Sequence, residues 1–141
     1  HDKLGNAPRA MVHYRKMLEI DPHHPLALNN LAFHLSSGDK DLDEALKYAQ
    51  MAREISPKNA AALDDTIGWI LYRKGLYASA VRTLRNAVAD EPNAVRRFHL
   101  AMAHFKAGDR KEAVAVYKSA VAANPDAPER AAAARLLGVN P

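Results

Sequence analysis

Cysteine is absent from the 141-residue chain. Its absence excludes disulfides, thiolate zinc sites, iron–sulfur clusters and a cysteine nucleophile, and it leaves the compartment open, because a cysteine-free chain suits either redox regime. Apolar runs of the roughly 18 residues that a membrane-spanning helix needs are also missing, so we expect no direct insertion into a membrane. With 48% hydrophobic and 26% charged residues, the chain has the composition of one folded domain.

An excess of positive charge is found only in one part of the chain. Residues 73–118 carry ten basic and four acidic side chains, a net of +6, whereas residues 1–72 carry eight basic and ten acidic ones. Such a patch favours an acidic partner. Nucleic-acid binders concentrate charge more densely and interleave it with stacking aromatic residues, so we expect no nucleic acid among the partners.

Internal repetition organises the chain. Four segments end on a proline, and these prolines are 35, 35 and 33 residues apart: Pro22, Pro57, Pro92 and Pro125. An alanine stands twelve residues before each of them, followed by small or large apolar residues four and seven places later. This spacing is one face of a helix that packs closely against a neighbour, and the proline ends that helix.

Another helical stretch precedes each of the last three segments, and a glycine turn joins the two helices. The turn glycines are Gly38, Gly75 and Gly108. After the turn, Asp109 can cap the second helix, and Asp41 with Glu44 three residues later fits a capping box. One such hairpin cannot bury both of its faces alone, so we expect the hairpins to stack.

These residues resemble the tetratricopeptide repeat family, of bacterial type, most closely over residues 65–75 and 99–108. The resemblance covers nearly the whole chain and implies an all-α fold, an α-solenoid of stacked antiparallel helix hairpins with right-handed superhelical curvature. Two departures from the family pattern stand early in the first helices, where Asp64 and Arg97 replace a bulky residue.

In this register residues 1–141 form a single domain. We expect full repeats at residues 25–59, 60–93 and 94–127, and a trailing half-repeat at residues 6–22, which would make the chain a fragment of a longer array. Residues 128–137 read as a C-terminal capping helix with Pro128 at its first position and Gly138 after its end. Self-association through the unpaired half-repeat, around Tyr14 and Met17, is one open alternative.

Motifs of known catalytic sites are missing. The sequence has no Gly-rich phosphate loop, nucleophile elbow, zinc-binding His-Glu-x-x-His or EF-hand loop. Asp64 and Asp65 point about 100° apart on a helix, so we interpret them as a cap or a solvated face. His99 and His104 are five residues apart, which is the wrong spacing for two metal ligands on one face. We therefore expect no enzyme activity, no metal and no cofactor.

The concave side of such a stack is lined by the first helix of each repeat. Phe33, Trp69 and Met102 occupy equivalent positions, so we expect them to form a row along a groove. The candidate groove residues are Asn29, Asn30, Phe33, Asp65, Thr66, Trp69, Tyr72, Arg73, Phe98, His99, Met102, Phe105 and Lys106.

Two observations limit this prediction. Phe98, Ala101, Met102 and Phe105 also fit an i, i+3, i+4, i+7 core stripe, in which case they are buried. Some family members hold a partner's terminal carboxylate with lysine and arginine, but Val95 and His99 stand at those places here. An internal, partly apolar segment is therefore the better candidate partner.

The sequence thus predicts a non-catalytic protein–protein interaction scaffold that binds a peptide or helical segment, neutral or acidic, in its concave groove. The alternative is a regulatory or substrate-presenting module of a larger enzyme or envelope assembly complex. That module would use a basic convex face, made of Arg82, Arg85, Arg110 and Lys111. The resemblance favours the bacterial cell envelope or periplasm and leaves the cytoplasm open.

Overall fold

A computed structural model of the chain describes residues 7–36, 38 and 40–141. These residues form eight α-helices and one short 3-10 helix, and they contain no strand. In chain order the elements are α1 (Ala7–Ile20), α2 (Pro25–Ser36), α3 (Leu42–Ile55), η1 (Pro57–Asn59), α4 (Ala60–Arg73), α5 (Tyr77–Asp90), α6 (Ala94–Lys106), α7 (Arg110–Ala123) and α8 (Glu129–Leu137).

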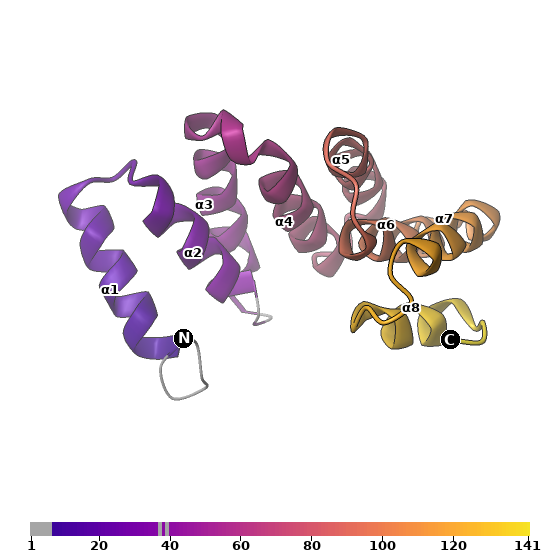
Figure 1. Cartoon of the computed structure of the whole chain (residues 1–141). Coiled ribbons are helices and arrows are strands. Elements are labelled where there is room, and N and C mark those ends of the chain that lie inside the picture. The colour runs from indigo at the N-terminus through magenta and orange to yellow at the C-terminus, as the bar shows by residue number, and fades with distance from the viewer. Residues whose placement is uncertain (1–6, 37, 39) are drawn as a thin grey trace.

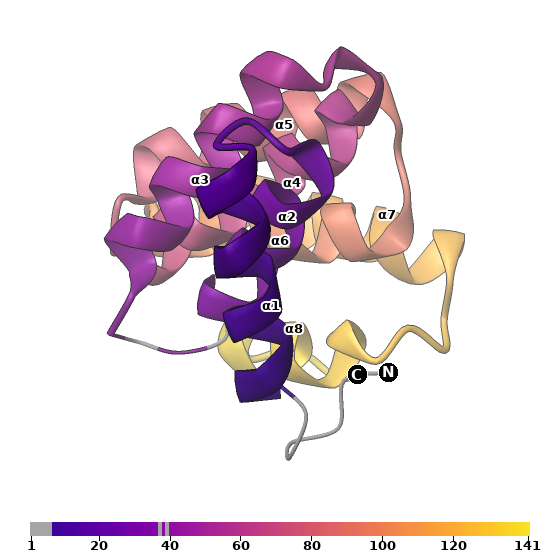
Figure 2. The same ribbon diagram turned by 90° about the vertical axis from the view of Figure 1, so that its left-hand side faces the viewer.

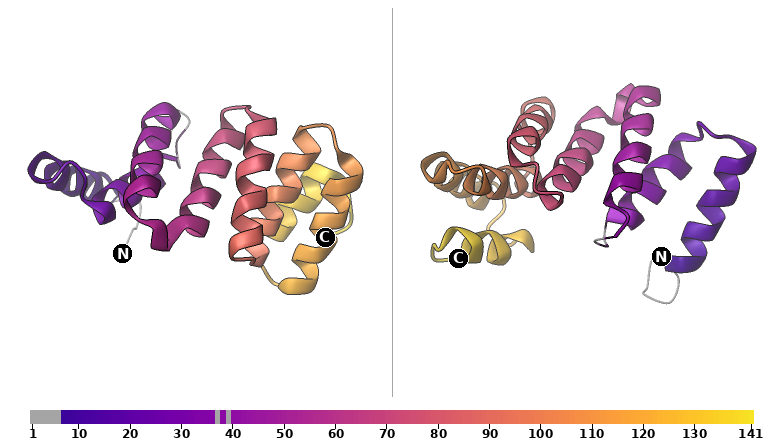
Figure 3. Two further views of the ribbon diagram at one scale, coloured as in Figure 1. Left: turned by 90° about the horizontal axis from the view of Figure 1, so that it is seen from above. Right: turned by 180° about the vertical axis from the view of Figure 1, so that it is seen from behind.

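Three antiparallel hairpins, α2–α3, α4–α5 and α6–α7, stack side by side into an arc, with α1 at one end and α8 at the other (Figure 1). The first helices of the hairpins and α8 lie on the inner side of this arc. Figure 2 shows the arc end-on, and Figure 3 shows α4–α5 and α6–α7 side by side from above. The predicted all-α solenoid is confirmed.

Small residues form the seams between the helices. The alanines at the start of the 0, 4, 7 pattern, Ala45, Ala80 and Ala113, are all fully buried. On α4 the small residue at the seam is Gly68. A Cβ on it would lie 2.5 Å from Leu84 Cγ and 2.7 Å from Leu84 Cδ2 on α5. The two helices of a hairpin can therefore approach this closely only at positions where the side chain is small or missing.

Two of the three predicted turn glycines adopt the left-handed backbone, whereas Gly38 does not, so the prediction is wrong at the first turn. Gly75 and Gly108 have φ values of 82° and 96°, in the left-handed region that other residues enter at a cost. Ser37 and Asp39, which flank the first predicted turn glycine, lie outside the described residues.

Helix caps agree with the sequence only in part. Asp109 caps α7 by accepting a hydrogen bond from the Glu112 backbone N–H at 3.1 Å, as predicted. The capping box at Asp41 is wrong, because the Asp41 side chain makes no cap hydrogen bond. Its expected partner, Glu44, instead accepts hydrogen bonds from Arg15 of α1 at 2.9 Å and from the Tyr48 hydroxyl at 3.1 Å. A tertiary ion pair has replaced a local cap.

The C-terminal end of the arc differs from the prediction in detail. Helix α8 begins at Glu129, with Pro128 as its N-cap residue and not its first helical residue, and it ends at Gly138 with φ 71°. At the other end, α1 packs on α2, where the rings of Tyr14 and His34 stack with centroids 6.0 Å apart.

Arginines hold the free carbonyls at several helix ends. Arg73 donates to the Ser36 carbonyl at the end of α2, Arg96 to that of Glu91 after α5, and Arg110 to that of Leu137 in α8. A guanidinium satisfies the unpaired carbonyl and complements the negative end of the helix dipole. Part of the basic excess is therefore used inside the fold, and Arg110 of the predicted basic face is one example.

We expect Gly68→Ala to lower the free energy of unfolding. Overpacking against Leu84 costs about 1–3 kcal/mol, and the higher helix propensity of alanine offsets up to about 1 kcal/mol of it. In a Leu84→Ala background the same substitution should become stabilising, because the obstructing side chain is gone. Urea unfolding followed by circular dichroism measures both steps, and an effect of the same sign in the two backgrounds would contradict the steric account.

Acidification should destabilise the protein through His104, which is only 6% exposed. Burial lowers the pKa of this imidazole below its ordinary value of 6.5, and nearby Arg85 adds to the lowering, while Glu112 and Asp109 oppose it. As pH falls below 6.5, the unfolded chain takes up a proton that the folded chain does not, so stability is lost from there down to the folded pKa. His104→Gln should lose less stability than the natural protein between pH 7 and pH 5, measured by urea unfolding at each pH. Equal losses would contradict this account.

Candidate functional site

The predicted row on the inner face is divided among three different environments. Phe33 on α2 is 60% exposed, and it stands on the same stripe as Leu26, which is 56% exposed. Trp69 on α4 is partly buried among other rings. Met102 on α6 is partly buried and packs on the hydrophobic cluster beneath α8. Equivalent places in the repeat therefore do not give equivalent surfaces.

Trp69 lies between two other rings. The Tyr72 ring stacks on it with centroids 4.6 Å apart and planes 6° apart, and the His99 ring stacks at 4.1 Å and 19°. Tyr72 in turn meets Tyr77 of α5 edge-on, at 5.6 Å, and the Lys106 ammonium lies 5.8 Å from the centre of the Tyr77 ring. Side chains of α4, α5 and α6 thus join in one aromatic assembly, which we call the Trp69 stack.

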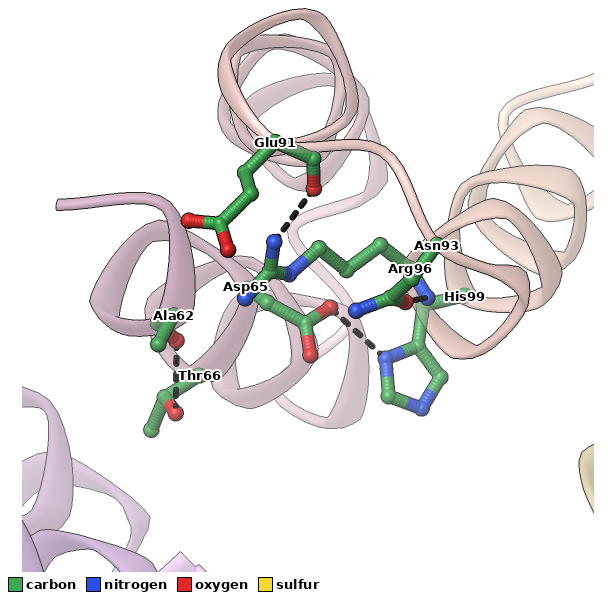
Figure 4. A network of polar contacts seen from close by, with 7 residues as sticks. All are labelled: Ala62, Asp65, Thr66, Glu91, Asn93, Arg96 and His99. Carbon is green, nitrogen blue, oxygen red and sulfur yellow. Dashed lines mark hydrogen bonds and ion pairs between the residues drawn. The ribbon is translucent and has the colours of Figure 1, made fainter. Parts of the chain in front are cut away.

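Hydrogen bonds hold His99 in this stack. Its Nδ1 lies 2.8 Å from Asp65 Oδ1, and both side chains are largely buried, so the contact ties α6 to α4 (Figure 4). A neutral His99 that donates from Nδ1 leaves Nε2 as an acceptor for a hydrogen bond from another molecule. Thr66, the next residue on α4, points away from this contact and donates from its hydroxyl to the Ala62 carbonyl at 3.1 Å (Figure 4). The interpretation of Asp65 as a cap or a solvated side chain is wrong, because His99 binds it.

Burial in the stack also affects Tyr72. Desolvation raises the pKa of the Tyr72 phenol above its ordinary value, and the neighbouring Tyr77 phenol adds to the rise. Tyr72 therefore stays neutral throughout the physiological range and offers a hydroxyl, not a phenolate.

Two of the predicted groove residues make contacts inside the fold instead of lining a groove. Phe98 is fully buried and meets Tyr117 of α7 edge-on at 5.7 Å, so its place in the groove is wrong. Arg73, predicted as a polar anchor, donates to the Ser36 carbonyl and so ties α4 to α2.

On α6 the core-stripe interpretation is the correct one. Phe98 and Ala101 are buried, and Met102 and Phe105 are partly buried against the same cluster, which α8 closes with Ala133, Ala134 and Leu137. Of the five groove candidates predicted on α6, His99 and Lys106 lie outside this cluster.

Sequence reasoning missed two residues. Tyr77 begins α5 directly after the Gly75 turn, and the turn brings its ring against Tyr72. Leu26 was overlooked although it stands seven residues before Phe33, which is two helical turns and therefore the same face. The spacing of Leu26 was a signal in the sequence; the position of Tyr77 depends on the path of the turn.

Asn29 and Asn30 complete the predicted set on α2. Asn29 is exposed between Leu26 and Phe33, and Asn30 is partly buried. Within the described ranges, no three acidic or histidine side chains gather as a metal site would require. No helix in that part of the chain is long and apolar enough to cross a membrane.

The sequence profile of the tetratricopeptide repeat matches residues 66–128 and 98–139, which together are more than half of the chain. The chain belongs to the tetratricopeptide repeat family. A TPR repeat-containing protein of Pseudomonas aeruginosa is 34% identical to it over 86 residues. That match covers 61% of this chain and only 14% of the Pseudomonas protein.

The fold of this tetratricopeptide repeat chain is also that of a crystal structure of a thermophilic TPR protein from Thermus thermophilus. The TM-score is 0.78, the sequences are 23% identical, and the likeness covers 96% of this chain and 75% of that one. At this identity the likeness concerns the fold alone. It agrees with the repeating hairpins described above.

The fluorescence of Trp69, the single tryptophan of the repeat chain, should report on the stack. His99→Ala and Tyr72→Ala each uncover one face of the indole, so we expect a red-shifted emission maximum and stronger quenching by acrylamide. Val12→Ala is the matched control, because Val12 is exposed on α1, which packs on α2 and not on α4, and it should leave the emission unchanged. Unaltered emission in both stack variants would contradict the stacking.

Proposed function

We infer that this chain is a non-enzymatic scaffold for protein–protein interaction, as tetratricopeptide repeat domains commonly are, because its stacked hairpins offer an extended concave surface. We propose that this chain binds a partly apolar peptide or helical segment of another protein across the inner faces of α2 and α4. The observation that carries the proposal is the exposure of Leu26 and Phe33 on α2, which contacts the helix α4 that carries Trp69.

Exposed apolar side chains on α2 form the first part of this surface. Leu26 and Phe33 lie on one stripe, with the amide of Asn29 between them. Two large apolar side chains, each more than half exposed on an inner face, are a feature of surfaces that bind other proteins. The Asn29 amide can donate and accept hydrogen bonds with a peptide backbone.

The Trp69 stack forms the second part. Its rings are held by mutual stacking and by the Asp65–His99 hydrogen bond, so little side-chain entropy is lost when a partner covers them. Trp and Tyr are the residue types that dominate binding energy when they are fixed near the centre of an interface. His99 Nε2 adds a ring nitrogen that can form a hydrogen bond, and the exposed Lys106 adds a positive charge at the far side.

A photo-crosslinking experiment tests this proposal directly. With p-benzoylphenylalanine in place of Phe33, the chain should crosslink in lysate of its source organism to a partner segment that mass spectrometry can place. Leu76, which is 47% exposed at the start of α5, is the matched control, and the same group at that position should not crosslink to the same segment.

Substitution then measures the contribution of each part. Phe33→Ala combined with Trp69→Ala should weaken binding of the crosslinked segment at least about tenfold, whereas Leu76→Ala should leave the affinity within about twofold. Equal affinities of the natural protein and the double variant, measured by calorimetry with the synthetic segment, would refute binding at the inner face.

A further inference from the structure

Equivalent positions in two neighbouring hairpins carry opposite charges, Asp64 in one and Arg97 in the other. At the junction of α3 and α4, Arg53 Nε donates to Asp64 Oδ1 at 3.0 Å, and the Asp64 side chain is only 15% exposed. This ion pair joins the end of a second helix to the start of the next first helix. Asp64 stands eleven residues before Gly75 and Arg53 four residues before Pro57.

The next junction lacks this ion pair. Counting back from Pro92 and Gly108 in the same way, the equivalent residues are Val88 on α5 and Arg97 on α6. The apolar Val88 offers no charge to a guanidinium. Arg97 is partly buried, and its side chain makes no hydrogen bond or ion pair with any other residue that the structure describes.

A cavity of about 270 Å³ lies at this place, between α5, α6 and α7. Val88, Leu100 and Val116 form its apolar wall, and Arg97 and Glu112 bring charge to it. At 100° per residue, Arg97 and Leu100 lie roughly 140° and 160° around α6 from Met102, so the cavity opens away from the inner face.

Basic side chains outnumber acidic ones on α5, α6 and α7. Arg85, Glu112 and Asp109 all lie close enough to His104 to affect its pKa, so charges of both signs stand near this part of α6. Exposed Arg82 and Lys111 add further positive charge on the second helices. Glu112 is the one carboxylate that lines the cavity among the residues named, and it offsets only part of this charge.

From these observations we infer that the cavity binds a protein segment in which a carboxylate side chain stands next to an apolar one. The partner's carboxylate pairs with Arg97 in the way that Asp64 pairs with Arg53 at the previous junction. The partner's apolar side chain covers Val88, Leu100 and Val116. An unpaired guanidinium beside an apolar wall selects this combination, because a charge-assisted hydrogen bond needs the carboxylate and the wall needs an apolar group. This docking site is separate from the inner face and does not depend on the proposed function.

Two small probes that differ only in charge test the inference. N-acetyl-leucyl-glutamate amide carries the carboxylate, and N-acetyl-leucyl-glutamine amide has nearly the same size without it. In NMR titrations, the acidic probe should shift the methyl signals of Val88, Leu100 and Val116 and the Nε signal of Arg97, with a millimolar dissociation constant. The neutral probe should bind at least about fivefold more weakly.

Variants of the cavity separate charge from packing. Arg97→Gln should remove the preference for the acidic probe, and Val88→Glu should remove it too, by giving Arg97 an internal carboxylate partner. Lys111→Gln is the matched control, because it removes one exposed positive charge that does not line the cavity, and it should change the affinity less than about twofold. Trp69→Ala should leave the titration unchanged, whatever its effect on binding at the inner face.

Several outcomes would overturn the inference. It fails if neither probe shifts these methyl signals, if both probes bind equally, or if Arg97→Gln leaves the preference intact. A hexanucleotide RNA that shifts the same signals with the same dependence on Arg97, and binds more tightly than the acidic probe, would assign the cavity to a phosphate and also overturn it.

Discussion

The close approach of paired helices is the constraint on which the rest of the structure depends. At Gly68 there is no room for even a Cβ beside Leu84, and the alanines at the start of each second helix are completely covered. Because the seams are so narrow, each hairpin has one way to close, and successive hairpins can stack at a constant offset. The inner face is a product of this stacking, since it brings side chains of α4 and α6 within contact.

Stacking also decides which polar side chains a partner can reach. Arg73 and Arg96 hold helix ends through carbonyl groups, and Asp65 holds His99. Each of these contacts pairs polar groups of two neighbouring helices, and so stabilises the junction between them. The inner surface that a partner can reach is mostly apolar and aromatic, with amides and a few charges at its margin. Such a surface recognises a segment through shape and apolar contact more than through ion pairs.

Equivalent positions in the repeats of this chain have different surroundings. Phe33, Trp69 and Met102 are equivalent in sequence, yet one is exposed, one is stacked between rings and one is packed beneath α8. Asp64 and Arg97 likewise share a place, and only Asp64 has an ion-pair partner. The neighbours of each position differ between hairpins, and so the same register supports different contacts in each of them.

The sequence by itself determined the period, the order of helices and turns, the left-handed turns at Gly75 and Gly108, and the seam residues, because all of these depend on local geometry and on a spacing that repeats. It did not determine the exposed surface of α6, where two overlapping stripes fit the pattern. The position of α8 decided between them by covering Phe98 and Met102. The sequence also did not predict that Arg15 of α1 binds Glu44 in place of the local cap. Both outcomes depend on which distant helix lies against a side chain, and only the tertiary structure places distant helices.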